Sequence, residues 1–170
     1  MEVQKTALYE THKNLGARFA PFAGYEMPIQ YSDGVVKEHI STRTYAGFFD
    51  VSHMGQLYIE GGSSVEDALE KIIPVDLKNL NMNQSKYSFL LNLEGGIIDD
   101  LIITKQKHGF YIVLNAACKD NDIKHISKNL TENHKFYLCS KNSLIAVQGP
   151  KSSEILEKKL QEISNLKFMY

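Results

Sequence analysis

The sequence contains no tryptophan, two cysteines and no long apolar run. Cys118 and Cys139 are too few and too far apart for a disulfide framework or a CxxC metal site, so we expect reduced, buried thiols. A membrane-spanning helix needs about 20 consecutive apolar residues, and no stretch approaches that length. The sequence therefore predicts a soluble globular protein with no membrane segment.

An excess of charge of either sign is also missing. Lys and Arg number 19 against 20 Asp and Glu, so the net charge is -1 and no basic field is available to hold nucleic acid. The first residues, MEVQKTALYETHK, include acids and lack the apolar core of a signal peptide. These observations predict a cytoplasmic protein that does not bind nucleic acid.

At 170 residues the chain is long enough for one domain with a true core. Amphipathic spacing and helix-stop signals predict helices at 6–16, 34–47, 63–73 and 120–130, with a further helix that follows Pro150 and runs through Leu160 and Ile163. We expect an apolar loop at 17–31, because prolines and Gly24 interrupt it. Ser63 and Glu66 are expected to form a capping box at the start of the third helix. The inner face of the first helix is predicted to carry Leu8, His12 and Leu15. The inner face of the second is predicted to carry Val36, Ile40 and either Tyr45 or Ala46.

Three apolar runs, KYSFLLN, IIDDLIIT and GFYIVLN, are separated by the turn sequences EGG and KQKHG. They predict an antiparallel meander, and a strand pair is expected at FYLCS and SLIAVQG. Strands joined by hairpins and interleaved with helices indicate an α+β fold. The chain stops on the apolar stretch NLKFMY, from which we expect a truncated domain at 1–170.

Few residues carry an obvious chemical motif. None of the six histidines is spaced from another His or Cys as metal ligands are, and no GxSxG elbow is present, so neither a metal site nor covalent catalysis is predicted. His53, in DVSHMG, is either a general base or a packing residue.

Asp99 and Asp100 are unusual neighbours in a predicted strand. Successive side chains of a strand point to opposite faces, so the two cannot form a carboxylate dyad on one substrate. Each is either hydrogen-bonded to backbone amides near the hairpin turn or kept for chemistry. Because both faces of this strand are otherwise apolar, we expect the sheet to be covered on both sides.

Several stretches match one family when they are taken together. They are PFAGYEMPIQY at 21–31, EHISTRTYAGFFDVSHMGQLYIEG at 38–61, GGIIDDLII at 95–103, YIVLNAA at 111–117 and LIAVQGP at 144–150. In this order they resemble the aminomethyltransferase, or T-protein, family of the glycine cleavage system. DVSHMG and GGIIDDLI are the specific pair.

The resemblance implies a folate-binding enzyme of glycine catabolism and one-carbon metabolism. Such an enzyme transfers the methylene of an aminomethyl group on the lipoyl arm of H-protein to tetrahydrofolate, and ammonia is released. By the same matching, Asp100 faces the folate as the catalytic residue, and Met54, Tyr87 and Asn115 line the folate cavity. Asp99 is then the structural member of the pair.

Two alternatives remain open at this stage. Relatives of this fold demethylate other small molecules with folate as acceptor, and others are non-catalytic folate-binding modules. Family members are considerably longer than this chain and carry a pterin-binding glutamate and an arginine in their later part. We therefore expect the 170 residues alone to bind folate weakly and to transfer little or nothing.

Overall fold

The computed structural model describes residues 3–131, 134–160 and 163–170. Residues Met54–Ser140 with Phe168–Tyr170 form one compact unit, here called the sheet unit. Residues Met1–His53 with Lys141–Lys167 form the other, here called the hairpin unit. Both contain antiparallel strands and helices, which confirms the predicted α+β class.

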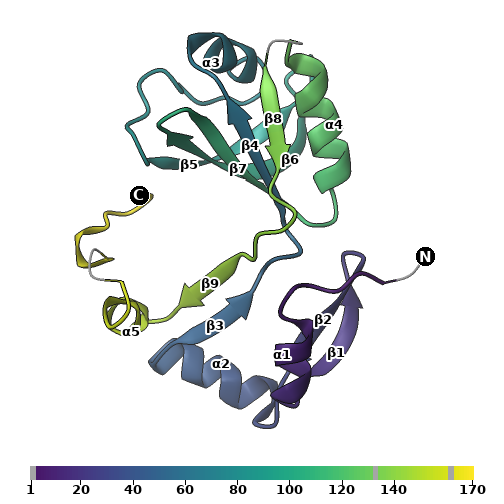
Figure 1. Ribbon diagram of the computed structural model, residues 1–170, viewed down its shortest axis with the longest axis vertical. Coiled ribbons are helices and arrows are strands. Elements are labelled where there is room, and N and C mark those ends of the chain that lie inside the picture. Colours follow the sequence, from purple (N-terminus) through teal and green to yellow (C-terminus); the bar gives the residue numbers. More distant parts are fainter. Residues whose placement is uncertain (1–2, 132–133, 161–162) are drawn as a thin grey trace. The chain divides into compact units, whose positions relative to one another are not determined.

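The sheet unit is built on five antiparallel strands in the order β5-β6-β7-β4-β8 (Figure 1). The predicted meander is confirmed as its first three strands. Gly109 opens the third of them with a φ of 155°, and a Cβ there would collide with the Ile59 carbonyl, so the turn requires glycine. The strands are β4 (Gly55–Glu60), β5 (Ser85–Leu91), β6 (Ile97–Gln106), β7 (Gly109–Leu114) and β8 (Lys135–Leu138).

Helices α3 (Ser63–Leu69) and α4 (Lys119–Asn129) cover one face of this sheet (Figure 1). Val65 and Leu69 of α3 and Ile126 of α4 belong to the same buried cluster as the strands. Burying one such aliphatic side chain contributes about 1.5–3 kcal/mol, so this face supplies most of the unit's stability. The strand residues on it are Leu57, Ile59, Leu90, Leu101, Ile103, Phe110, Ile112 and Leu114.

The opposite face of the sheet, here called the open face, is different. Tyr87 is 56% exposed, Ile102 is 39% exposed and Phe89 is 37% exposed. The prediction of a sheet covered on both sides is therefore wrong for the part of the chain described. The sequence of β6 shows that both faces of the strand carry apolar side chains, but it does not show that both faces are buried.

The hairpin unit contains two short sheets of two strands each. The first is a hairpin in the segment predicted to be a loop, and its turn uses Ala23 and Gly24, both with positive φ. The Glu26 N–H points away from β1, to the Gln4 carbonyl, so the nitrogen of Pro28, two residues further on, faces the same outer side and removes no bond between β1 and β2. The elements are α1 (Tyr9–Asn14), β1 (Arg18–Phe22), β2 (Tyr25–Gln30), α2 (Gly34–Thr44), β3 (Gly47–Asp50), β9 (Ile145–Gln148), α5 (Ser152–Glu157) and η1 (Ile163–Asn165).

Two predicted inner helix faces need correction. His12 is buried as expected, but Leu15 is exposed. Val36 and Ile40 of α2, and Tyr45 directly after it, are all more than half exposed, and the helix has no buried residue. Helical spacing predicts which residues share a face, but not whether another element covers that face.

Three other local predictions are wrong in detail. α3 begins after Gly62 without a side-chain cap, and Glu66 forms an ion pair of 2.9 Å with Lys105 Nζ in place of a capping box. β8 and β9 do not pair with each other, since β8 joins β4 and β9 joins β3. The last predicted helix ends at Glu157, and its expected continuation crosses residues 161–162, which lie outside the described part.

Candidate functional site

Strand register places Asp100 on the open face of the sheet unit. Asp100 pairs with Phe89, and Tyr87 pairs with Ile102 two residues further along. Asp99 pairs instead with the fully buried Leu90. Because directly paired residues share a face, the two aspartates point to opposite sides of the sheet, as the pleating argument predicted.

A β-bulge lies next to this aspartate pair. Leu90 pairs with Asp99 and Leu91 with Ile97, which leaves Ile98 as the extra residue in β6. Bulges bend a strand and change the direction of nearby side chains, and they are frequent beside active sites. The sequence carried no signal for this bulge beyond the adjacent glycines.

Asn115 joins the two aspartates although they face apart. Its Nδ2 donates to Asp100 Oδ1 at 2.9 Å and to Asp99 Oδ1 at 3.0 Å, and it lies 3.3 Å from the Asp100 carbonyl oxygen. Asp99 Oδ1 also accepts the Asp100 backbone N–H at 2.9 Å. The side-chain amide therefore fixes the Asp100 carboxylate at the end of the strand.

Tyr87 and Met54 lie close to this pair by strand position. Tyr87 is in T-shaped contact with Phe89, with ring centroids 5.8 Å apart. Partial desolvation, followed by the negative charge of Asp100 and a hydrogen bond to it, raises the pKa of Tyr87, so its hydroxyl remains a donor. Gly55 pairs with Leu114, which places the preceding Met54 at the same end of the sheet as Asn115.

The four residues predicted to form the site thus belong to one unit, with Met54, Asp100 and Asn115 toward one end of its sheet and Tyr87 nearer the middle. This arrangement presents an anchored carboxylate beside exposed aromatic surface. A carboxylate so placed can accept a hydrogen bond from a ligand N–H or stabilise a developing positive charge. Flat aromatic and soft thioether groups suit the rings of a heteroaromatic ligand.

Two acids behind the sheet have opposite ionisation behaviour. Burial would raise the pKa of Asp99, but hydrogen bonds from Asn115, the Asp100 amide, Asp122 and Cys118 outweigh it and keep the pKa below its ordinary value. Burial, together with Asp99 and Asp100, raises the pKa of Asp122 to about 7. Sequence reasoning missed Asp122, whose only signal is its place in the first turn of the predicted helix.

Neither the cysteines nor the histidines form a reactive centre in the described residues. The negative charge of Asp99, then burial and a hydrogen bond to Asp99, raises the pKa of Cys118, so it stays a thiol. Both cysteines are free. The described residues contain no group of three or more His, Cys, Asp or Glu side chains suited to a metal ion.

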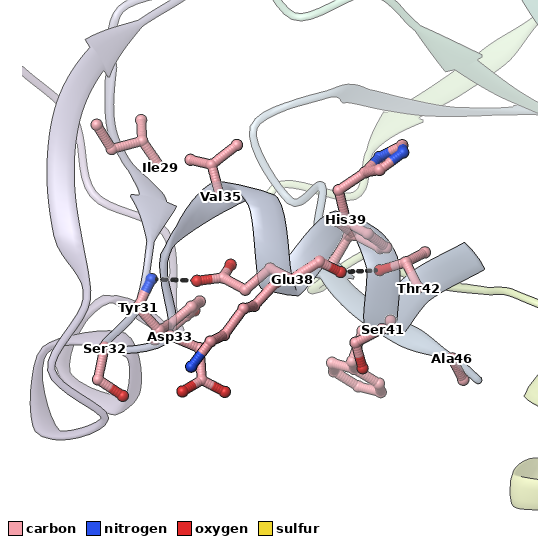
Figure 2. A pocket seen from close by; sticks show the side chains of 14 residues that line it. Ile29, Tyr31, Ser32, Asp33, Val35, Glu38, His39, Ser41, Thr42 and Ala46 are labelled. Atoms are coloured by element: carbon pink, nitrogen blue, oxygen red, sulfur yellow. Dashed lines mark hydrogen bonds between the residues drawn. The ribbon is translucent and has the colours of Figure 1, made fainter. Parts of the chain in front are cut away.

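The hairpin unit carries a pocket of about 490 Å³ between α2 and the strands beside it (Figure 2). Glu38 accepts the Tyr31 backbone N–H at 2.6 Å, and Thr42 donates to the Glu38 carbonyl. None of the four predicted site residues lines this pocket. His53, in the same unit, packs edge-on to Phe22 at 5.5 Å, which favours the packing interpretation of this residue.

A second buried network stabilises the hairpin unit. Asp50 Oδ2 accepts hydrogen bonds from the Thr6 hydroxyl at 2.7 Å and from His12 Nε2 at 3.0 Å. The Tyr31 hydroxyl is 2.7 Å from His12 Nδ1, so the network links α1 with β3 and the end of β2. These buried polar side chains supply one another's hydrogen bonds, so we interpret the network as structural.

A known protein family matches nearly the whole chain. A family model described as the GCVT N-terminal domain matches residues 8–170. The chain belongs to the GCVT family. This match confirms the family resemblance inferred from the sequence.

Members of the GCVT family are similar to the chain along almost its whole length. A mitochondrial aminomethyltransferase of Dictyostelium discoideum is 47% identical over 99% of the chain, and an aminomethyltransferase of Caldanaerobacter subterraneus subsp. tengcongensis is 38% identical over 99%. The crystal structure of glycine cleavage system aminomethyltransferase T from Bartonella henselae superposes with a TM-score of 0.86 at 38% identity over 92% of the chain.

The chain spans 44% and 46% of the two relatives and 43% of the Bartonella protein. Less than half the length of each of these three proteins is thus matched. No helix in the described residues is long and apolar enough to cross a membrane. Since the Dictyostelium relative is named as mitochondrial, the cytoplasmic location stays a prediction.

Proposed function

We propose that the chain provides the folate-facing half of a tetrahydrofolate-dependent aminomethyltransferase of the glycine cleavage system. The observation that carries the proposal is the Asp100 carboxylate, fixed by Asn115 on the open face of the sheet beside Tyr87. The names of the similar GCVT-family proteins support the same reaction.

In this reaction the methylene carbon passes from H-protein to folate. Its bonds to the lipoyl sulfur and to the amine nitrogen break, and two bonds to nitrogen atoms of tetrahydrofolate form. The two protons lost by those nitrogens balance the thiol and the ammonia that leave. The products are 5,10-methylenetetrahydrofolate, ammonia and the reduced lipoyl dithiol.

The role proposed for Asp100 follows from its position. A fixed carboxylate accepts a hydrogen bond from the attacking N–H and stabilises the cationic intermediate without having to act as a strong base. Tyr87 and Met54 supply apolar contact to the folate rings, and Asn115 holds the carboxylate. Lipoylated H-protein is the proposed partner and tetrahydrofolate the proposed cosubstrate.

The test uses the protein that contains this chain. It is incubated with tetrahydrofolate and aminomethylated H-protein, and methylenetetrahydrofolate and ammonia are measured. Formation of both in equal amounts is the expected result. Product from small methylated amines but not from H-protein would indicate a folate-dependent demethylase, and folate binding without turnover of either would indicate a non-catalytic module.

A further inference from the structure

Asp122 is a buried acid that the proposed reaction does not use. It lies in the first turn of α4 and is fully buried, with an exposed fraction of 0%. Neither of its carboxylate oxygens receives a hydrogen bond from a donor in the described residues. An ionised carboxylate without donors is costly in such a place, so the residue needs an explanation.

Asp99, the acid that faces Asp122, also has a carboxylate oxygen without a hydrogen-bond donor. Asp99 Oδ1 accepts from Asn115 and from the Asp100 amide, but Asp99 Oδ2 is buried and receives no donor. Asp99 and Asp122 are within hydrogen-bonding reach of each other. Two carboxylate oxygens can be bonded in this way only when one of them carries a proton.

The surroundings decide which acid holds that proton. Asp99 is stabilised as an anion by the Asn115 amide, the Asp100 N–H and the Cys118 thiol, whereas Asp122 has no such donors. The titratable groups that face Asp122 are Asp99 and Asp100 from β6 and Cys118 from the segment before α4. None of them is a cation, and the raised pKa of Asp122 agrees with the neutral form.

We propose that Asp122 is a positioning residue of the folate site, which as a neutral acid donates its proton to Asp99 Oδ2. Asp99 is then held from both sides, with Oδ2 on Asp122 and Oδ1 on the Asn115 amide that fixes Asp100. Loss of the proton would place a second negative charge against Asp99 and loosen this arrangement. The role in folate binding rests on the function proposed above, but the proton on Asp122 does not.

The test compares Asp122→Asn with Asp122→Ala in the protein that contains this chain. Asparagine keeps a donor for Asp99 at every pH, whereas alanine removes it. Asp120→Asn, at an exposed acid in the same helical turn, is the matched control. Tetrahydrofolate affinity is measured by calorimetry, and the thermal unfolding midpoint is measured from pH 5 to pH 8.5.

We expect the wild type to lose tetrahydrofolate affinity as the pH rises through about 7. Asp122→Asn should keep the affinity across the range, and Asp122→Ala should lower it about tenfold even at pH 6, the size of one hydrogen bond to a charged group. Asp120→Asn should follow the wild type. Equal affinity profiles for wild type and Asp122→Asn would overturn the positioning role.

Unfolding tests the proton independently of folate. Because the folded pKa of Asp122 lies above its unfolded value, the folded state binds the extra proton, and stability falls as the pH rises from the unfolded pKa to about 7 and levels off above it. The wild-type midpoint should therefore fall relative to Asp122→Asn over this range. A difference between the two that does not change with pH would show that Asp122 is not protonated, whether or not the protein binds folate.

Discussion

At the scale of single residues, Asn115 connects the two aspartates of the site. One Nδ2 group contacts both Asp100 Oδ1 and Asp99 Oδ1, so the same amide links the open face of the sheet to the acids behind it. The resemblance of VLNAA to the family predicted that Asn115 lines the folate cavity. The structure adds that Asn115 fixes the carboxylate, a contact that strand alternation alone does not predict.

Replacing Asn115 by alanine should therefore impair transfer more than it impairs folding. The Asp100 carboxylate loses the Asn115 amide and is left with the Tyr87 hydroxyl as side-chain donor, and misplacement of such a group costs about 10- to 100-fold in kcat. Steady-state kinetics of methylenetetrahydrofolate formation would measure this. An unchanged kcat would show that Asp100 is positioned without Asn115.

At the scale of helices and strands, the hydrophobic patterns of the sequence predicted the positions of the elements better than the contacts between them. The apolar runs gave β5, β6 and β7 correctly, and helical spacing placed α4 at 120–130. The same patterns missed the hairpin at 18–30, because a tight turn with positive φ leaves no periodic signal. They also predicted that Val36 of α2 is buried, because the spacing of residues does not show whether another element packs on that face. The meeting of Asp99 and Asp122 comes from packing of α4 on the sheet and could not be predicted from spacing.

Helix α4 holds Asp122 in place through Ile126, one turn further along and fully buried in the core cluster. Ile126→Ala leaves a cavity and should lower the free energy of unfolding by about 2–5 kcal/mol. Urea denaturation would measure the loss. Lys128→Ala, at an exposed position of the same helix, should change stability by less than about 0.5 kcal/mol, and a similar loss in both variants would contradict this account of α4.

At the scale of the whole molecule, the near-balanced charge leaves pH dependence to a few buried groups. Burial would raise the pKa of Asp50, but hydrogen bonds from Ser52, Thr6 and His12 outweigh it and hold the pKa below its ordinary value. Asp50 therefore adds stability above an unfolded pKa of about 3.9, whereas Asp122 reduces stability as the pH rises toward 7. The two effects together favour a mildly acidic optimum.

Asp50→Asn should remove the loss of stability that the wild type shows at acid pH. At pH 7 the variant should be less stable than the wild type by about 1–3 kcal/mol, the cost of disturbing a buried hydrogen-bonded charge. The difference should shrink as the pH falls below about 4, because the wild-type carboxyl then takes up a proton. Thermal unfolding of both proteins between pH 3 and pH 7 would measure it, and a difference that grows in acid would refute the assignment.

The most direct measurement for the account as a whole is the rate of methylene transfer to tetrahydrofolate in Asp100→Asn and Asp99→Asn, made in the protein that contains this chain. Asp100→Asn should lower the rate about 100-fold or more with the unfolding midpoint unchanged, since it removes the charge on the open face. Asp99→Asn should act mainly by lowering the midpoint. A normal rate in Asp100→Asn would contradict the central claim that this carboxylate serves the reaction.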